Sequence, residues 1–190
     1  EEENGLALKR GKQTYLFQHP AAIRSFAAIG SKREGEGPLG EFFDTIDPDS
    51  TFGQKSWERA ESRLHHDTVE LAGKKAGLSY ADLDCLLAGD LLNQCIGATF
   101  GVRELGIPYL GIYGACSNMA EGLLLSAFLA ESGLRYLGVS TASHFCTAER
   151  QYRFPLEYGG QRTPTSQWTV TGGGAVVVAG AAAQTPDQAG

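Results

Sequence analysis

Cys116 stands at the junction of two apolar segments, where a thiol has the surroundings that nucleophilic catalysis or anion binding requires. Residues 108–113 have the composition of a short buried strand, and residues 119–130 are apolar on every helical face, which is typical of a deeply buried helix. A thiol between them lies beside first-turn N–H groups and the positive end of the helix dipole, which stabilise a thiolate or a bound anion. Unpaired cysteines also serve as small buried hydrophobes. Three roles are therefore open for Cys116: nucleophile, wall of an anion pocket, and core residue.

Asp90 follows another predicted strand, residues 84–88, and is the second candidate for the site. Because ligands in open α/β sheets bind beyond the carboxyl ends of the strands, Asp90 and Cys116 are expected to face one cleft. An aspartate after a strand also commonly caps the next turn, and only the partnership with Cys116 favours a binding role for Asp90. Asn93, in the same Gly89–Gln94 segment, is included among the predicted ligand-binding residues.

The segment 144–155 mixes charged and aromatic residues too densely for an ordinary connector, and long loops of this kind are usually functional. Arg150 could donate two parallel hydrogen bonds to a carboxylate ligand, or pair internally with Glu149 or Glu157. His144 is the one histidine near a predicted strand end, and we interpret it as a residue that anchors the loop at the pocket rather than as a catalytic base. Both Arg150 and His144 are predicted ligand-binding residues.

Strands and helices alternate along the chain in the order expected for an α/β fold. The helix predicted at 56–76 is bounded by a capping serine and a glycine, and its polar face carries His65 and His66, which are expected to be solvated. Residues 30–40 are predicted to be a loop rich in glycine and charge. Strands are predicted at residues 14–17, 21–29, 84–88, 108–113, 134–140, 167–171 and 175–179, and the apolar helix at 117–132. This alternation predicts parallel pairing with helical crossovers.

Composition excludes several classes of function. The 190 residues carry a formal net charge of -6 with interspersed signs, so nucleic acid is not an expected partner and anionic lipid has no evident electrostatic attraction for the chain. The longest apolar run, residues 122–130, is too short to span a bilayer. The four cysteines form no CxxC pair, which favours reduced thiols, and the spacing around Cys146 and His144 does not suit a metal site.

Several strings of residues resemble those of the stage V sporulation protein AD family. The resemblance follows the chain in order over most of its length, and the strings are long and compositionally unusual. They comprise Lys32–Leu39, Ser56–Glu61, Gly89–Gln94, Gly114–Ser117, Ala148–Pro155, Glu157–Gly159 and Gln167–Gly172.

The resemblance implies a thiolase-like α/β fold, in which two similar βαβαβαββ halves form a layered pseudo-dimer. It places a single half in residues 1–180, with a mixed, mostly parallel five-stranded sheet and a buried central helix, and a flexible tail at 181–190. The family's chain normally continues for a comparable length, and its second half supplies the far wall of the pocket, including a histidine. We therefore expect this half to associate with the missing C-terminal half or with a second copy as a homodimer.

The resemblance also implies a binding function in spore formation. Members of the family bind dipicolinic acid (pyridine-2,6-dicarboxylate), free or as its calcium chelate, and take part in its uptake into the developing spore. Asp90 and Cys116 match pocket positions of the family. No cofactor is expected other than calcium bound together with dipicolinate. The implied partners are integral membrane proteins of the same uptake system. The implied location is the cytoplasmic face of the developing spore, peripheral on the spore inner membrane without a transmembrane segment.

The alternative is a β-ketoacyl synthase or thiolase-like acyltransferase with Cys116 as nucleophile. Such an enzyme needs a histidine, and a second histidine or an asparagine, within reach of the sulfur. The sequence offers no convincing set of these residues. We therefore expect ligand binding without turnover and keep acyl transfer as the alternative.

Overall fold

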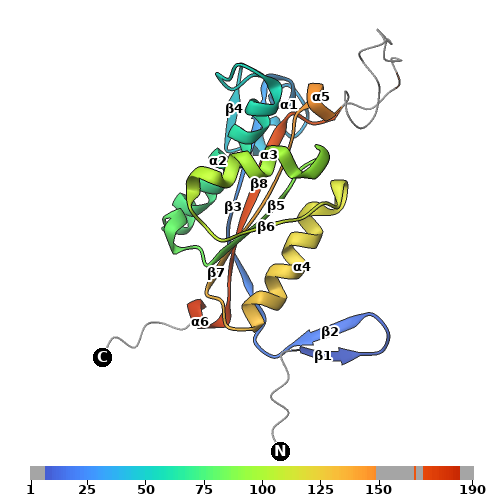
Figure 1. Cartoon of the computed structure of the whole chain (residues 1–190), viewed down its shortest axis with the longest axis vertical. Helices are drawn as coiled ribbons and strands as arrows, with labels where there is room; N and C mark the ends of the chain where they lie inside the picture. Colours follow the sequence, from blue (N-terminus) through green and yellow to red (C-terminus); the bar gives the residue numbers. More distant parts are fainter. Residues whose placement is uncertain (1–6, 149–164, 166–168, 185–190) are drawn as a thin grey trace, which may run out of the picture.

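A six-stranded sheet lies at the centre of the molecule and carries helices on both faces (Figure 1). The computed structural model describes residues 7–148, 165 and 169–184. In space the strands follow the order β4-β3-β8-β7-β5-β6. The bounds of these strands are β3 Ala22–Ser31, β4 Thr45–Asp47, β5 Cys85–Gly89, β6 Tyr109–Gly111, β7 Tyr136–Ser143 and β8 Gly172–Ala179. The helices are α1 Lys32–Gly35, α2 Trp57–Ala76, α3 Ile96–Val102, α4 Asn118–Glu131, α5 Phe145–Ala148 and α6 Ala181–Gln184.

The sheet is mixed, as predicted, because β8 runs antiparallel to both of its neighbours while the other pairs are parallel. The predicted number of five strands is wrong: the short β4 adds a sixth at the edge beside β3. The prediction of two strands around Gly172–Gly174 is also wrong, since these glycines begin β8 itself. A Cβ on Gly173 would lie 3.2 Å from Cβ of Leu64, so glycine lets α2 pack close to the sheet.

Alternate side chains of the central strands divide the core into two layers. On β5, Leu86 and Ala88 pack with residues of α2 and α3, whereas Cys85 and Leu87 pack with residues of α4. This alternation follows from the two-residue period of a strand, and both sets are apolar because helices cover both faces. The sheet is therefore the rigid element that places the loops after β5, β6 and β7 at one end.

The long helix α2 begins and ends where the sequence predicts. The Ser56 side chain caps the first turn by accepting a hydrogen bond from the N–H of Arg59, and Gly77 ends the helix in the left-handed conformation with φ of 74°. A Cβ is disfavoured in that conformation, which explains the glycine. Ala60 and Leu64 are buried on the face toward the sheet.

The predicted central helix is α4, and in this chain it is buried along one face. It buries a stripe of small residues, Gly122, Ser126 and Ala130, while Leu124 and Leu125 are 55% and 38% exposed. The sheet covers one side of the helix. On the outer side Tyr15 and Phe17 pack against Phe128, while Leu124 and Leu125 stay exposed. The apolar residues in the sequence of α4 thus include some that lie on an exposed outer face, and an exposed apolar face of this kind often marks an interaction site.

A two-stranded hairpin, β1 Ala7–Arg10 and β2 Thr14–Phe17, projects beside the lower end of α4 (Figure 1). The strand predicted at 14–17 is confirmed, whereas β1 was not predicted. Two segments predicted to be irregular contain short helices: α1 lies within the loop 30–40, and α6 occupies the first part of the tail. Among the described residues no helix is long and apolar enough to cross a membrane.

Candidate functional site

An open cavity of about 680 Å³ lies at the carboxyl ends of β5 and β7. Asp90 and Cys116 both line it, so the two strand-end residues face one cleft as their positions suggest. Polar and small residues form much of the wall, and Phe43, Met119 and Val170 add apolar surface. The wall also includes Gly89, Leu91, Ala115, Asn118, Thr141, Ala142, Ser143, Thr169, Gly172, Gly173 and Gly174.

Cys116 occupies a tight turn that leads directly into α4. Residues Ala115–Ser117 form a single 3-10 turn, and Ala115 has a φ of 52°, a left-handed conformation that costs free energy for any residue with a Cβ. The Ser117 hydroxyl donates to the carbonyl of Gly114 at 2.8 Å and fixes the turn. The thiol of Cys116 is exposed to the cavity at the beginning of the helix. This arrangement places a thiol on the wall of the cavity at the start of a helix.

Asp90 is 1% exposed, and its carboxylate is used by the protein backbone. Oδ1 accepts from the N–H of Leu92 at 2.7 Å, and Oδ2 accepts from the N–H of Ala98 at 2.6 Å. Burial raises the pKa of Asp90, while these two hydrogen bonds oppose that effect. The side chain therefore holds the turn after β5 and the first turn of α3, which is the capping role that the sequence left open. Asp90 shapes the cavity wall.

Asn118 joins the two strand-end turns and was missed in the sequence. Its side-chain oxygen accepts from the N–H of Gly114 at 2.6 Å, and its amide nitrogen donates to the carbonyl of Asp90 at 3.3 Å. The residue is 2% exposed and lines the cavity beside Cys116. A buried asparagine in the first turn of an apolar helix is the signal that could have revealed it, because buried amides require partners.

Two of the predicted ligand-binding residues lie away from the cavity. Asn93 is exposed, and its side-chain oxygen accepts from the hydroxyl of Tyr113 at 2.9 Å. His144 is buried: Nδ1 accepts from the N–H of Cys146 at 3.1 Å, so Nε2 donates to the carbonyl of Ser50 at 2.8 Å. Burial lowers the pKa of His144. These contacts are consistent with the interpretation of His144 as a loop anchor, and neither His144 nor Asn93 is among the described residues that line the cavity.

Arg150 lies outside the described residues, so its predicted contact with a carboxylate stays a prediction.

The buried face of α2 contains ionisable residues that the sequence did not reveal. Glu61 and His65 are both 0% exposed, and the prediction that His65 is solvated is wrong. Oε2 of Glu61 accepts from the hydroxyl of Thr147 at 2.6 Å, and Nδ1 of His65 lies 2.9 Å from the hydroxyl of Ser140. Burial raises the pKa of Glu61 to about 8 and lowers that of His65 to about 3. Both side chains are therefore uncharged at neutral pH.

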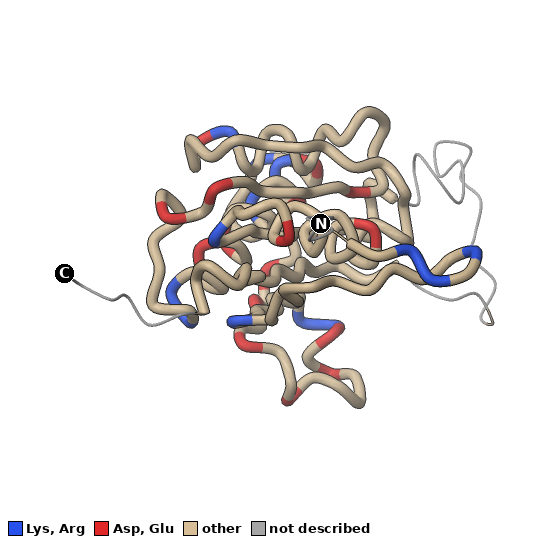
Figure 2. Tube along the Cα trace, turned by 90° about the horizontal axis from the view of Figure 1, so that it is seen from below, with Lys and Arg blue, Asp and Glu red and all other residues tan. Residues whose placement is uncertain are grey.

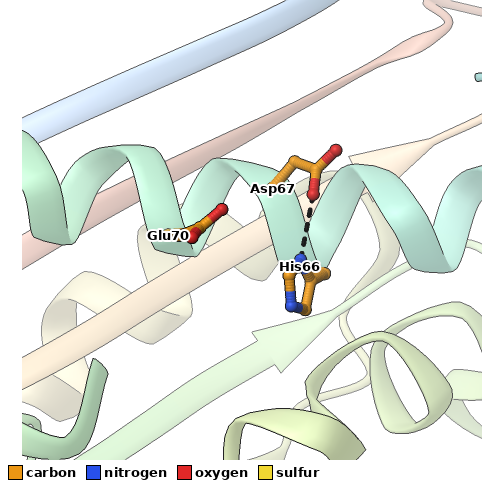
Figure 3. A group of neighbouring side chains, drawn as sticks. All are labelled: His66, Asp67 and Glu70. Carbon is orange, nitrogen blue, oxygen red and sulfur yellow. Dashed lines mark hydrogen bonds and ion pairs between the residues drawn. The ribbon is translucent and has the colours of Figure 1, made fainter. Parts of the chain in front are cut away.

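A second polar cluster lies on the outer surface of α2 (Figure 3). His66, Asp67 and Glu70 bring possible metal-ligating atoms within 4.8 Å of one another. Asp67 pairs with Arg63 at 2.7 Å and Glu70 with Lys74 at 2.9 Å. These cations already compensate both carboxylates, so we interpret the cluster as a set of surface ion pairs.

The sequence profile of the stage V sporulation protein AD family matches residues 11–187. The chain belongs to this family. A relative in Bacillus subtilis (strain 168), stage V sporulation protein AD, is 45% identical over 177 residues, which cover 93% of this chain and 51% of that protein. The chain thus spans about half the length of the family member that it matches.

Solved structures with the same fold include OleA and a 3-oxoacyl-[acyl-carrier-protein] synthase III. A variant of OleA from Xanthomonas campestris matches with a TM-score of 0.54 and 16% identity, covering 84% of this chain and 56% of that one. The 3-oxoacyl-[acyl-carrier-protein] synthase III of Aquifex aeolicus VF5 matches with a TM-score of 0.54 and 18% identity, covering 84% and 53%. At this identity the likeness establishes the fold alone, which is thiolase-like as predicted.

Proposed function

We propose that this chain takes part in binding dipicolinic acid, free or as its calcium chelate, and in its uptake into the developing spore. Membership of a sporulation family supports the biological role. The observation that carries the binding proposal is the cavity at Cys116, which lies at the start of α4. His144, the histidine considered as a base, is hydrogen-bonded to Ser50 and Cys146 and is not among the described residues that line the cavity. A cavity at the start of a helix, without His144 in its described lining, supports anion binding rather than turnover.

The ligand chemistry fits the cavity wall. A planar aromatic dicarboxylate presents a ring that suits the apolar side chains of Phe43, Met119 and Val170. One of its carboxylates would lie against the N–H groups at the start of α4, where a helix favours negative charge. Both oxygens of Asp90 are occupied by backbone donors, so calcium would arrive already chelated by the ligand.

Calorimetric titration with dipicolinate, with and without calcium, tests the proposal. It uses the chain joined to the second half that its longer relatives contain. We expect Cys116→Phe, which fills the cavity, to weaken binding at least about tenfold, and Cys116→Ser to bind almost as the parent does. The absence of binding heat at millimolar dipicolinate, both with and without calcium, would refute the proposal.

Acyl transfer is the second candidate, and the turn at Cys116 is the observation that favours it. An exposed thiol after the strained Ala115, at the start of an apolar helix, has the geometry of an activated nucleophile. Incubation with an acyl-CoA followed by intact-mass measurement discriminates the two functions. A mass increase that disappears in Cys116→Ser would favour the enzyme; an unmodified thiol favours binding.

We further propose that the outer face of α4 is covered by the missing C-terminal half or by a second copy of this chain. Leu124 and Leu125 are the exposed apolar side chains that require this cover. The chain alone should form dimers in light scattering, and Leu124→Glu with Leu125→Glu should yield monomers. Phe100→Glu, at a 58% exposed site on α3, is the control that should leave the dimer intact. A folded monomer of the parent chain would contradict the homodimer.

The remaining parts of the proposal concern the cellular location of the protein and its interaction partners. We place it at the cytoplasmic face of the developing spore, peripheral on the spore inner membrane, in a complex with integral membrane proteins of the same uptake system. Pull-down from sporulating cells with the joined protein tests this assembly. Recovery without any integral membrane protein of that system would contradict it.

A further inference from the structure

The projecting hairpin differs in charge from the rest of the chain. Residues 7–17 contain Lys9, Arg10 and Lys12 and no acidic residue, although the whole chain has a formal net charge of -6. All three basic side chains are exposed. Figure 2 shows the basic residues along the projecting hairpin. Among the described residues, none of the three takes part in an ion pair.

The register of the hairpin separates two faces. Tyr15 and Phe17 lie on the inner face and contact the ring of Phe128 on α4 edge to face, at centroid distances of 5.3 and 5.0 Å. Leu8 and Leu16 are paired on the opposite face, where they are 37% and 47% exposed. Two aliphatic side chains thus lie side by side on a surface without described cover.

The base of the hairpin is fixed to the body of the molecule. The carboxylate of Glu131, at the end of α4, accepts from the N–H of Gln18 at 2.8 Å and from the N–H of His19 at 3.0 Å. Together with the aromatic contacts on Phe128, these hydrogen bonds orient the hairpin relative to α4. The basic turn therefore points away from the sheet in a defined direction.

We propose that this hairpin docks on an anionic phospholipid surface. Arg10, on the same face as Leu8 and Leu16, and Lys12, in the turn, would meet lipid phosphates, and the two leucines would enter the boundary between headgroups and acyl chains. Lys9 is paired with Tyr15 on the inner face and would add to the positive charge of the hairpin. A stable protein interface buries roughly 800 Å² per partner. A bilayer needs no such area, because charge attraction and shallow insertion of a few apolar groups suffice. The inference does not depend on which ligand the cavity binds.

The hairpin also changes an expectation drawn from composition. The net charge of the whole chain gives no attraction to anionic lipid, but the field near a surface depends on the charges within about 10 Å of it. The basic residues on the hairpin are concentrated at one projecting end, so a negatively charged chain can still present a basic contact.

Co-sedimentation of the protein with vesicles tests the assignment. The probe is a mixture of phosphatidylglycerol and phosphatidylcholine, compared with phosphatidylcholine alone. We expect binding to the anionic vesicles that weakens with salt. The variant K9Q/R10Q/K12Q should lose on the order of a hundred-fold in partitioning, together with the salt dependence. The variant L8S/L16S should lose about tenfold and keep the salt dependence.

A matched control separates the hairpin from net charge. K55Q/R59Q/R103Q removes the same number of exposed cations from the region of α2 and α3, and it should bind as the parent does. Circular dichroism verifies that all variants keep the fold. Equal binding to neutral vesicles, or equal losses in the control and the hairpin variant, would overturn the assignment. Failure of the parent to bind anionic vesicles would overturn it too, and would leave an acidic protein as the complement of the hairpin.

Discussion

Glu61 and His65 lie one turn apart on the buried face of α2, and Oε1 of Glu61 and Nε2 of His65 are buried without a hydrogen-bond partner among the described residues. Their burial shifts the two pKa values in opposite directions, to about 8 for Glu61 and about 3 for His65. Each side chain is thereby kept neutral inside the protein at pH 7. The free energy of unfolding should therefore decrease at alkaline pH, where Glu61 becomes charged, and at acidic pH, where His65 becomes charged.

The parent protein should lose stability at alkaline pH, and the substitution Glu61→Gln should abolish this loss. The folded-state pKa of Glu61 is raised above its ordinary value of 4.5, so its contribution is fully present below that pH and is lost as pH rises through about 8. His65 contributes stability above its ordinary pKa of 6.5 that is lost as pH falls toward about 3. Between pH 4.5 and 6.5 the two residues change the free energy of unfolding in opposite directions as the pH rises. Between pH 6.5 and 8 only the Glu61 contribution changes.

Urea unfolding at several pH values measures this effect. From pH 6.5 to 8, the free energy of unfolding of the parent should fall by about 2 kcal/mol relative to that of Glu61→Gln. Glu70→Gln is the control, because Glu70 is partly exposed and paired with Lys74, and this variant should follow the parent. Parallel curves for the parent and Glu61→Gln would contradict the assignment.

Asp90→Asn distinguishes a structural carboxylate from one that contacts ligand. An asparagine has one oxygen and cannot accept from the N–H groups of both Leu92 and Ala98. The free energy of unfolding should therefore fall by about 2 to 3 kcal/mol. Asp82→Asn, at an exposed cap that accepts from Ser79, should lose less than about 1 kcal/mol. Unchanged stability of Asp90→Asn combined with lost dipicolinate binding would show that the carboxylate serves the ligand.

Local patterns in the sequence predicted the parts of the fold that depend on neighbouring residues. The caps of α2 and the positions of Asp90 and Cys116 after strands are of this kind, since strand ends gather at one edge of the sheet. The burial of His65 could not be predicted, because its partner Ser140 is 75 residues away. The strand β4 has only three residues and no readable period.

Predictions from hydrophobicity and net charge failed for a second reason. Neither property contains information about what packs against a particular segment. The apolar composition of α4 indicates the amount of surface that could be covered, but Leu124 and Leu125 on its outer side stay exposed. The overall charge likewise hides the basic hairpin at Lys9–Lys12. Both errors concern surfaces that the described residues leave exposed.

Alkylation should identify Cys116 as the most accessible thiol. Cys85 and Cys95 are buried, burial raises the pKa of both thiols, and the sulfur of Cys95 donates to the carbonyl of Ile112 at 3.2 Å. With iodoacetamide at neutral pH, peptide mapping should show Cys116 modified at least about tenfold faster than these two, with Cys146 between them. In urea the four rates should converge. Equally fast native modification of Cys85 would be inconsistent with the fold.

The position of Cys116 depends on how closely α4 packs on the sheet, and Gly122→Val tests this dependence. A Cβ at Gly122 would lie 2.5 Å from Cγ1 of Val139 and 3.3 Å from Cδ1 of Ile112, so the helix must move outward. We expect a loss of about 1 to 3 kcal/mol in the free energy of unfolding. Ala120→Val, at an exposed position of the same helix, is the control. Its free energy of unfolding should fall by only about 0.5 kcal/mol, because a β-branched residue has a lower helix propensity than alanine.

An outward movement of α4 should also displace the turn that begins it, because Asn118 ties the helix start to Gly114 and Asp90. The alkylation rate of Cys116 and the affinity for dipicolinate should therefore change in Gly122→Val and not in Ala120→Val. Equal stability of the two variants would mean that the helix does not rest on the sheet at Gly122. A destabilised Gly122→Val with an unaltered cavity would mean that the turn at Cys116 is held by Asn118 independently of the helix it begins.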